Sequence, residues 1–299
     1  MKKLLFTGSN GFLGKNIIPL LHKIGYNIIT LNRSESLICC DLSNEVPSLS
    51  NSFDIVIHAA GKAHSVPKSN LEIKSFFDVN LQGTINLCRG LEKSGIPKSF
   101  IFISSVAVYG SDFGENISEN HPLKGRTPYA LSKIRAEHYL LEWSQKNDVI
   151  LSVIRPSLIS GPNPPGNLGV MINGIKTGKY FSISKGKAKK SVLMVQDIAN
   201  LIPLLAEKGG IYNVCDSEHP TFRDLEIIIA RQLGRNLPLS IPIKLAKILA
   251  LIGDLIGGWS PINSNKLRKI TKSLTFSNEK AKKDLDWKPI NVIQNFKIH

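Results

Sequence analysis

Two side chains that could exchange a proton stand four residues apart. Tyr129 and Lys133 occur in PYALSK, within a stretch that follows a helical pattern. Side chains at i and i+4 lie on one helix face, so we expect the phenol and the ammonium to be neighbours. A nearby positive charge lowers the pKa of a phenol because it stabilises the phenolate. Such a phenol can take or give a hydroxyl proton while a hydride moves to or from a nicotinamide ring.

Two serines could add a third group to this site. Ser104 and Ser105 end SFIFISS, a β-rich apolar run that predicts a strand. We expect Ser105 to hydrogen-bond the reacting oxygen and to share the proton with Tyr129. Serines in this position also cap the start of a loop, and that alternative stays open.

The first glycine-rich turn has the layout of a phosphate-binding loop. In TGSNGFLG, three glycines lie between an apolar run and an amphipathic one. Gly8 would make the tight turn, Gly11 would let backbone approach a pyrophosphate, and Gly14 would let the helix pack close to the strand. An ordinary tight turn is the alternative. We expect contacts with a dinucleotide from Gly8, Asn10, Gly11, Phe12, Leu13 and Gly14.

The end of the second expected strand bears on which dinucleotide is bound. A carboxylate there would bond the ribose hydroxyls of NAD, but this chain has Asn32 followed by Arg33. Arg33 could pair with the 2′-phosphate of NADP or be a solvated surface charge. Asp41, followed by Leu42, could accept a hydrogen bond from the adenine amine or cap its own loop. The expected cofactor is therefore NAD or NADP, with the choice open.

Strand-like and helix-like segments alternate through the first half of the chain. Short β-rich runs occupy 2–8, 26–33, 37–42, 53–61, 99–105 and 150–157, and helical patterns occupy 12–24, 70–94 and 129–146. This alternation predicts an α/β fold with a Rossmann-like, doubly wound parallel sheet. Later helices are expected near 195–207, 221–234 and 243–257. Residues 1–160 are expected to form mainly the NAD(P)-binding domain, and 161–299 mainly a smaller C-terminal substrate-binding cap, interleaved with the last strands.

The composition is that of an ordinary globular protein with a basic surface. The 299 residues are 42% hydrophobic and carry a formal net charge of +15. That charge suits anionic partners but does not choose among nucleotides, nucleic acid and a membrane surface. The four cysteines lack metal-ligand or disulfide spacing, and no signal peptide or membrane-spanning run occurs. We expect a cytoplasmic protein with no metal site, no nucleic-acid partner and no stable membrane insertion.

Several motifs together resemble those of the extended short-chain dehydrogenase/reductases, specifically the NAD-dependent epimerase/dehydratase family that acts on nucleotide sugars. The resemblance covers nearly the whole chain. It rests on TGSNGFLG, HAAG at 58–61, VNLQGT at 79–84, SSVAVYG at 104–110, PYALSK at 128–133 and IRPSLISGP at 154–162. VLMVQDIA at 192–199 resembles a further family segment, in which Asp197 is expected to be structural.

The resemblance implies roles for individual residues. It makes Ser105, Tyr129 and Lys133 the expected catalytic residues. Cofactor contacts beyond the glycine turn are expected from Asn32, Arg33, Asp41, Leu42, Ala59, Ala60, Gly61, Asn80, Ser104, Tyr129, Lys133 and Pro156. Contacts with a nucleotide-diphosphate sugar are expected from Lys62, His64, Ser105, Val106, Ala107, Tyr129, Ser157 and Asn167. The family also implies a homodimer in which helices 70–94 and 129–146 pair with their symmetry mates.

Departures from the family pattern narrow the reaction. Where the 4,6-dehydratases carry Thr-Asp-Glu, this chain has Ser105-Val106-Ala107, which lacks the acid and the base that removing water needs. The glutamate of the family's decarboxylases is also missing at Ala107. Redox chemistry at a sugar carbinol remains, with C4 expected. We favour 4-epimerisation, with NADPH-dependent reduction of a 4-keto sugar as the close alternative and a non-catalytic NAD(P)-binding regulatory protein as the distant one.

One apolar run near the C-terminus leaves two roles open. LPLSIPIKLAKILALIGDLIGG resembles the cap of family members involved in bacterial surface-polysaccharide synthesis. Its stretch 243–257 is amphipathic and could pack in the cap or lie on a membrane near enzymes of lipid-linked glycans. Packing within the cap is the favoured interpretation.

Overall fold

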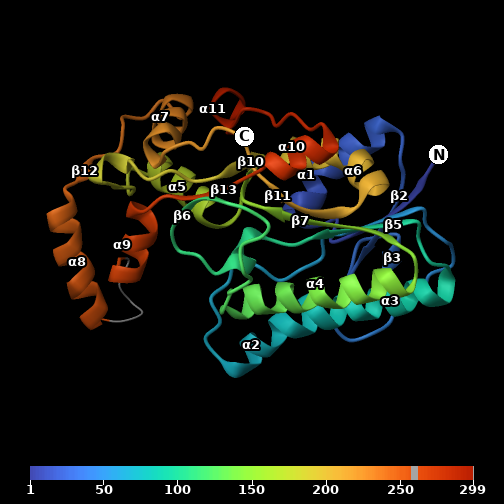
Figure 1. Ribbon diagram of the computed structural model, residues 1–299. Helices are drawn as coiled ribbons and strands as arrows, with labels where there is room; N and C mark the ends of the chain where they lie inside the picture. The colour runs from blue at the N-terminus through green and yellow to red at the C-terminus, as the bar shows by residue number, and fades with distance from the viewer. Residues whose placement is uncertain (257–261, 299) are drawn as a thin grey trace.

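A seven-stranded parallel sheet forms the centre of the computed structural model, which describes residues 1–256 and 262–298 (Figure 1). The strand order is β11-β7-β5-β4-β1-β2-β3. These strands are β1 (Lys3–Thr7), β2 (Asn27–Asn32), β3 (Ile38–Cys39), β4 (Ile55–His58), β5 (Ser99–Ile103), β7 (Ile150–Pro156) and β11 (Gly210–Val214). The chain winds outward from β1 in both directions, which confirms the expected doubly wound α/β fold.

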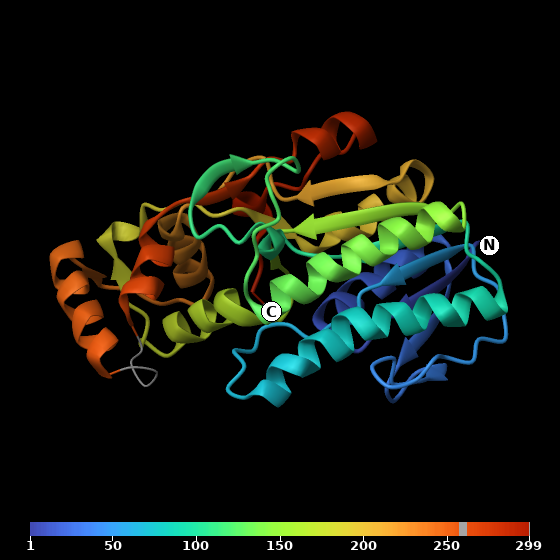
Figure 2. The same cartoon turned by 60° about the horizontal axis from the view of Figure 1, so that its bottom comes forward.

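Helices cover both faces of this sheet (Figures 1 and 2). One face packs against α1 (Phe12–Ile24), α6 (Val195–Lys208) and α10 (Glu279–Leu285), and the other against α3 (Gly83–Ser94) and α4 (Pro128–Lys146). In β1, Leu4 and Phe6 enter the first core and Leu5 enters the second, because successive strand side chains point to opposite faces. Burial on both faces explains why the strands are continuous apolar runs.

The helix expected over 70–94 is interrupted. A π-helical turn, Asp78–Gln82, separates α2 (Asn70–Phe77) from α3. Such turns are rare within helices and are frequent at functional sites. Asn80, one of the expected site residues, lies in this turn.

Residues after β7 build a smaller lobe and also return to the sheet through α6 and β11. The remaining helices are α5 (Gly166–Lys176), α7 (Phe222–Gln232), α8 (Ile243–Ile256), α9 (Ser264–Thr271) and α11 (Val292–Asn295). Short parallel pairs join β8 (Leu158–Ser160) to β10 (Val192–Met194), β9 (Ser182–Ile183) to β12 (Ser240–Ile241), and β6 (Gly114–Ile117) to β13 (Leu274–Phe276). Single 3₁₀ turns occupy Val106–Tyr109 and Ser184–Gly186. Helix α5 was not predicted, because prolines and glycines around it signal loops; the domain boundary at residue 160 stays a prediction.

Asp197 ties α6 to the C-terminal segment. Its carboxylate accepts hydrogen bonds from the backbone N–H of Ile290 (3.1 Å) and from the Trp287 indole (3.3 Å). Burial raises the pKa of Asp197 to about 7. These contacts are those of the structural residue that the sequence predicted.

Helix α8 packs differently from the expectation. Its buried residues are Ala246, Ala250 and Gly253, and the two alanines pack with Leu267 of α9; the large apolar side chains after Ile243 are exposed. The prediction that the apolar face of 243–257 packs within the cap is therefore wrong for the large side chains, and residue 257 lies outside the described residues. Within 1–256 and 262–298, no helix is long and apolar enough to cross a membrane.

Candidate active site

The three glycines of the first turn have different reasons to be glycine. Gly8 has a φ of 79°, and a Cβ there would lie 2.7 Å from the backbone N of Ala60. A Cβ on Gly14 would lie 2.4 Å from Cα of Ser9, so this glycine meets the turn's own backbone rather than the strand that we expected. At Gly11 the nearest atom is the Gly8 carbonyl oxygen, 3.2 Å away. The chain itself thus requires Gly8 and Gly14, while a Cβ on Gly11 would be crowded by that one oxygen and by no other atom within 4 Å.

The N-terminus of α1 is suited to a phosphate. Gly11 caps this helix without any side-chain hydrogen bond, and the first turn carries no acidic residue. The first N–H groups of a helix lack partners within it, and the helix dipole adds a partial positive charge there. The space beside Gly11 and these amide groups together fit the pyrophosphate of a dinucleotide.

Asn32 and Asn10 connect the end of β2 to the glycine turn. The Asn32 side-chain amide donates to the hydroxyl of Ser9, and the Asn10 amide donates to the Ser34 carbonyl at 3.1 Å. Asn32 therefore positions the turn as well as replacing the carboxylate that would contact an NAD ribose. Arg33 is exposed beside them, where it is free to meet a 2′-phosphate or solvent.

Asp41 adopts the capping role that the sequence left open. Its Oδ1 accepts hydrogen bonds from the backbone N–H (3.1 Å) and hydroxyl (2.7 Å) of Ser43, and its Oδ2 accepts from Asn44 (3.0 Å). The Ser43 hydroxyl bond is the main cause that lowers the pKa of Asp41. Leu42 is buried in the core next to Gly83. Contact of Asp41 with adenine stays a prediction.

His58 links the glycine turn to the π-helical turn through a buried relay. Its Nδ1 accepts from the Thr7 hydroxyl (2.6 Å), and Thr7 Oγ1 accepts from the backbone N–H of Ala60 (3.2 Å). Thr84 Oγ1 donates to the Asn80 carbonyl (2.7 Å), so the His58 Nε2–H donates to Thr84 (3.0 Å). Burial lowers the pKa of His58 to about 3, so the ring is neutral and has both nitrogens in hydrogen bonds.

The side chain of Asn80 holds the HAAG loop against α4. Its Oδ1 accepts from the backbone N–H of Lys62 (2.7 Å), and its Nδ2 donates to the Lys62 carbonyl (3.1 Å) and to Ser132 Oγ (2.8 Å). A Cβ on Gly61 would lie 3.1 Å from Asn80 Oδ1 and 3.3 Å from Lys133 Nζ. Asn80 is almost completely buried, so it acts by positioning this loop.

Tyr129 and Ser105 meet where β5 ends and α4 begins. Thr127 caps α4 by accepting from the N–H of Ala130, which places Tyr129 in the first helical turn. Burial raises the pKa of the Tyr129 phenol, and a hydrogen bond with the Ser105 hydroxyl acts to lower it. Ser105 Oγ also accepts from the N–H of Ala107 at 3.1 Å. Ser105 therefore caps the 3₁₀ turn, as the alternative proposed, and lies beside the phenol; its contact with the reacting oxygen stays a prediction.

Lys133 is buried one helical turn beyond Tyr129. Its Nζ donates to the Ile103 carbonyl (2.8 Å) and lies 4.5 Å from the ring centroid of Phe102. Burial lowers the pKa of Lys133 to about 8, and the Glu137 carboxylate opposes that shift. The expected lowering of the Tyr129 pKa by Lys133 is not seen, because burial of the phenol raises that pKa and the Lys133 ammonium, hydrogen-bonded to the Ile103 carbonyl, does not offset it.

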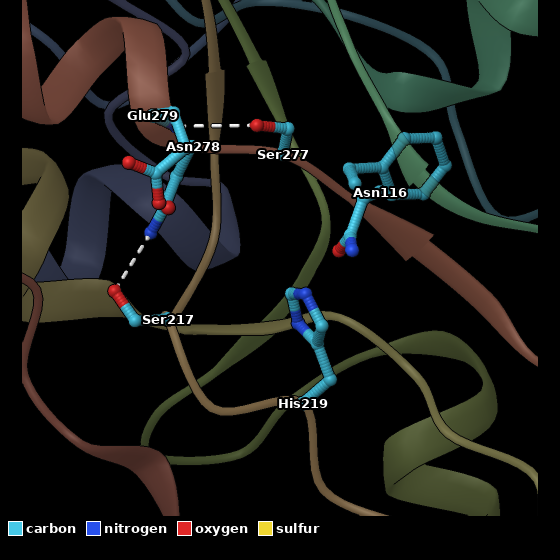
Figure 3. Close-up of a pocket in the computed structure, with 7 residues that line it drawn as sticks. Asn116, Ser217, His219, Ser277, Asn278 and Glu279 are labelled. Carbon is cyan, nitrogen blue, oxygen red and sulfur yellow. Dashed lines mark hydrogen bonds between the residues drawn. The ribbon is translucent and has the colours of Figure 1, made fainter.

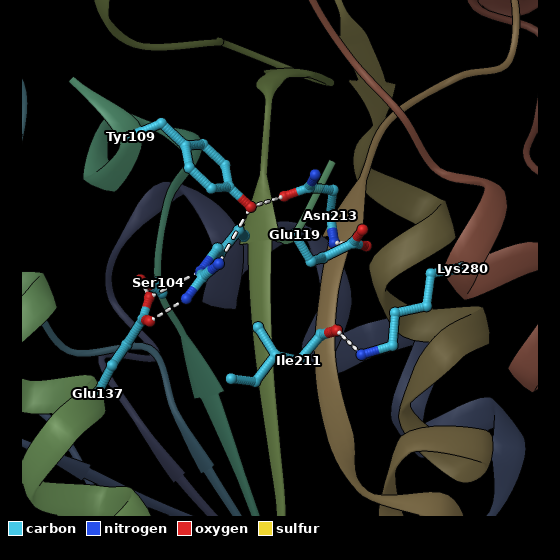
Figure 4. Close-up of polar contacts among 8 residues, drawn as sticks. Ser104, Tyr109, Glu119, Glu137, Ile211, Asn213 and Lys280 are labelled. Atoms are coloured by element: carbon cyan, nitrogen blue, oxygen red, sulfur yellow. Dashed lines mark hydrogen bonds and ion pairs between the residues drawn. The ribbon is translucent and has the colours of Figure 1, made fainter. Parts of the chain in front are cut away.

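A buried polar network lies behind these groups and was not predicted (Figure 4). Glu137 on α4 accepts hydrogen bonds from Arg155 on β7, at 3.2 Å from Nε and 2.6 Å from Nη2, and from the Ser104 hydroxyl. Arg155 Nη1 donates to the Tyr109 hydroxyl (3.0 Å), which donates to Asn213 Oδ1 (2.6 Å). Ser104, expected at the cofactor, has its hydroxyl directed into this network.

Two signals in the sequence could have revealed that network. Glu137 follows Lys133 by four residues, which places both on one face of the same helix. Arg155 interrupts the apolar strand that ends at Pro156, and a charge inside a buried strand requires a partner. Neither signal names that partner.

Besides Tyr129, the expected substrate residues lie on the 3₁₀ turn, the segment after β7, the 60s loop and α5. Val106 and Ala107 are half-buried in the 3₁₀ turn after Ser105. Ser157 follows β7, and its buried hydroxyl is one of the few described polar groups without a hydrogen-bond partner. That orphaned hydroxyl fits a site for a ligand that would complete its bonding.

The 60s loop forms another part of this surface. Lys62 Nζ lies 5.4 Å from the ring centroid of Phe76, which in turn stands 6.5 Å from the Tyr129 ring. His64 contacts Gly166 at the start of α5, where a Cβ would lie 2.9 Å from His64 Nδ1, and Asn167 follows. Loop and helix thus bring Lys62, His64 and Asn167 into one neighbourhood.

A separate polar hollow lies between β13 and the loop after β11 (Figure 3). Its groups bond to one another: the Asn278 amide donates to Ser217 Oγ (3.2 Å), and the Glu279 N–H donates to Ser277 Oγ (3.3 Å). None of the predicted site residues lines this hollow.

The sequence of the chain from 4 to 215 matches the model of the NAD dependent epimerase/dehydratase family. The chain belongs to this family. The match includes the glycine turn, HAAG, Asn80, Ser105, the Tyr129–Lys133 pair and the strand with Arg155. It confirms the resemblance, the enzyme class and the NAD(P) type of cofactor.

Individual epimerase/dehydratase relatives span most of the chain. A protein from Escherichia coli O157:H7, N-acetyl-α-D-glucosaminyl-diphospho-ditrans,octacis-undecaprenol 4-epimerase, is 28% identical over 93% of this chain and 88% of its own length. The GDP-6-deoxy-D-mannose reductase of Pseudomonas aeruginosa is 29% identical over 77% of this chain and 79% of its own. A Thermotoga maritima UDP-glucose 4-epimerase, solved with UDP-glucose, superposes over 98% of this chain and 95% of its own with a TM-score of 0.75 at 21% identity, which confirms the fold.

Proposed function

We propose that this epimerase/dehydratase family member is a nucleotide-sugar 4-epimerase in which Tyr129 is the acid and base. The observation that carries the proposal is the meeting of Tyr129 and Ser105 above the buried Lys133, at the carboxyl end of β5. Ligands of open α/β sheets bind at this edge, next to the topological switch between β1 and β4. Among its relatives, an enzyme named as a 4-epimerase covers 93% of the chain.

In this mechanism, Tyr129 accepts and returns the proton of the sugar hydroxyl. Its phenolate would take the proton of the C4 hydroxyl during oxidation and return it during reduction. Ser105 hydrogen-bonds the reacting oxygen and holds it in line with the phenol. Lys133 has its Nζ on the Ile103 carbonyl beside the loop at 60–62, so we assign it to holding the cofactor next to the phenol and not to lowering the pKa of Tyr129.

The residues that would hold NAD(P) are those of the glycine turn, the HAAG loop and Lys133. A bound nicotinamide supplies the acceptor and donor of the hydride. The N–H groups of α1 would bind the pyrophosphate, and Asn80 holds the loop at 60–62 that lies beside Lys133. Arg33 remains the residue whose charge would favour binding of NADP over NAD.

The side chains after Ser105 argue against a 4,6-dehydratase. Val106 and Ala107 occupy the 3₁₀ turn that follows the catalytic serine, and neither can move a proton. Eliminating water requires an acid and a base on the sugar. We therefore propose that the keto sugar is reduced again rather than dehydrated.

A second candidate substrate is a sugar carried on a polyprenol diphosphate. The relative from Escherichia coli O157:H7 favours it, because its name specifies undecaprenol as the carrier of its sugar. Both candidate substrates present the same sugar-diphosphate group to the site. The proposed residues and the proton path are unchanged between them.

Mass spectrometry of nucleotides released from the freshly denatured protein tests the reaction type. Retained NAD, together with interconversion of a C4-epimeric pair of diphospho-sugars without added cofactor, supports the epimerase. Stoichiometric consumption of NADPH with a 4-keto sugar would instead establish the reductase. Failure to bind either dinucleotide would overturn both, whereas dinucleotide binding without turnover of any diphospho-sugar would favour the NAD(P)-binding regulatory protein.

A further inference from the structure

Helix α8 presents its large apolar side chains to solvent. Leu251 is 62% exposed and Leu255 is 90% exposed. The other exposed apolar residues of this helix are Leu245, Ile248, Leu249, Ile252 and Ile256. Exposed apolar residues scattered singly need no explanation, but a contiguous cluster on one helix marks an interaction surface.

The orientation of α8 is the reverse of that of an ordinary surface helix. Ala246, Ala250 and Gly253, spaced by four and three residues, form a buried stripe of small residues, and the two alanines pack with Leu267 of α9. Leu251 and Leu255 also lie four residues apart, on the side away from that stripe. The helix stands at the end of the molecule remote from β1 and β2, so its outer side is open (Figures 1 and 2).

The segment that carries this apolar face is strongly basic. Residues 240–272 contain six lysines and arginines and a single acidic residue, Asp254. That carboxylate accepts hydrogen bonds from the N–H (3.1 Å) and hydroxyl (2.5 Å) of Ser264. Arg268 and Lys269 pair with Asp112 at 2.6 and 3.2 Å.

We propose that α8 docks this protein peripherally on an anionic lipid bilayer, with the apolar face of the helix in the interface and the surrounding basic residues near the head groups. Lys244 and Lys247 are exposed on α8 itself, next to the leucines. A helix with apolar and lysine-bearing sides lies in the plane of a bilayer in this way. A basic juxtamembrane segment and an overall charge of +15 add attraction to anionic lipid.

Charge distinguishes the bilayer from a second copy of the chain as the occupant. In a two-fold dimer through α8, each basic segment would face its identical mate, and like charges would repel. An anionic bilayer complements both the apolar and the basic character of the surface. With 14 residues, α8 is too short to span the hydrocarbon, which requires docking along the surface.

This inference goes beyond the proposed reaction and rests on α8 and the basic character of the chain, not on the active site. It puts the diphospho-sugar site on a protein held at the membrane surface, where the enzymes that supply or consume a lipid-carried sugar work. A vesicle-binding measurement contains no sugar substrate. Its outcome is therefore independent of whether the protein is an epimerase or a reductase.

Flotation with vesicles tests the proposal. We expect the full-length protein to float with phosphatidylglycerol–phosphatidylcholine vesicles and to bind pure phosphatidylcholine vesicles less, with binding that weakens as salt increases. The double variant Leu251→Gln, Leu255→Gln should lose roughly tenfold or more of the vesicle partition coefficient, because both side chains bury apolar surface on docking. The matched double variant Leu37→Gln, Val66→Gln, which changes apolar residues 74% and 85% exposed elsewhere, should bind like the wild type.

Three outcomes would overturn it. The wild type could fail to float with anionic vesicles, or the α8 variant could bind them as well as the wild type. The α8 variant could also change the sedimentation coefficient of the protein in the absence of lipid, which would make this face a contact between copies. Circular dichroism and thermal unfolding of both double variants establish that they fold, because all four replaced side chains are exposed.

Discussion

The buried carboxylate of Glu137 offers the sharpest test of how the active-site helix is held. Its side chain is 1% exposed and that of Arg155 is 4% exposed, with 2.6 Å between Glu137 Oε2 and Arg155 Nη2. Removing one partner of a buried ion pair costs about 3–5 kcal/mol, because the other charge is left buried without compensation. We expect Glu137→Gln to lower the free energy of unfolding by about 3 kcal/mol, near the lower limit, since glutamine keeps one acceptor oxygen.

Urea unfolding followed by tryptophan fluorescence measures this loss, and Glu279→Gln is the matched control. Glu279 forms a 2.8 Å pair with Lys282, but its side chain is 74% exposed. Exposed pairs contribute about 0–1 kcal/mol, so this variant should unfold almost like the wild type. Similar changes in the two variants would refute the structural role of the Glu137–Arg155 pair.

The same substitution should move the pH profile of activity. Burial lowers the pKa of Lys133 to about 8 while the Glu137 carboxylate raises it, so Glu137→Gln should lower that pKa further. The alkaline limb of kcat/KM, where Lys133 loses its proton, then shifts to lower pH. Lys133 also makes the free energy of unfolding depend on pH. Between its pKa in the folded protein and its ordinary pKa in the unfolded chain, Lys133 binds fewer protons in the folded state than in the unfolded state. Lys133 therefore makes stability rise with pH from about 8 towards its ordinary value of 10.5. An unshifted alkaline limb in the variant would contradict the coupling.

Three further predictions concern catalysis and the cofactor. Tyr129→Phe should lower kcat by ~10²–10⁴-fold and leave dinucleotide binding largely intact, as measured by steady-state kinetics and titration; full activity would remove Tyr129 as the acid and base. Gly11→Val should weaken dinucleotide binding with little loss of stability, whereas Gly14→Ala should destabilise the fold, because its Cβ would lie 2.4 Å from Ser9 Cα. Calorimetry and ligand titration of both variants separate the two effects. Native dinucleotide affinity in Gly11→Val would make the loop an ordinary turn. If Arg33 pairs with the 2′-phosphate, Arg33→Ala should weaken NADP binding by about tenfold to a hundredfold and leave the affinity for NAD nearly unchanged. Both dinucleotides are titrated at one fixed salt concentration, because salt screens the contact. Equal NADP affinities in variant and wild type would make Arg33 a surface charge.

Local patterns predicted the first half of the molecule well. The helix over 12–24 begins and ends where the sequence placed it, and the strands that flank it follow. Gly8 must be glycine because its φ is positive, and the turn around it is set by residues close in sequence. The spacing of Tyr129 and Lys133 likewise places both on one helix face. Local sterics and periodicity depend on near neighbours only, so a single sequence expresses them.

Contacts between segments far apart in the sequence could not be predicted from these local patterns. The π-helical turn around Asn80, the hydroxyl of Ser104 on Glu137 and the pairing of Glu137 with Arg155 all depend on which elements the sheet order brings together. The expected effect of Lys133 on the Tyr129 phenol failed for the same reason. The Lys133 ammonium donates to a carbonyl on β5, and burial in the assembled core is the main cause of the pKa shifts of both Tyr129 and Lys133.

Helix α8 shows most clearly the difference between what local sequence patterns predict and what depends on tertiary contacts. The sequence by itself predicted an amphipathic helix near 243–257 and favoured packing of its apolar side within the cap. Only the tertiary structure decided that the small stripe is buried, with Ala246 and Ala250 against α9, and that Leu251 and Leu255 face outward. Periodicity states which side chains share a face, whereas the face that becomes buried depends on the shape and distance of the neighbouring helix. Small side chains permit the closer approach between two helices, and that contact left the larger apolar surface exposed.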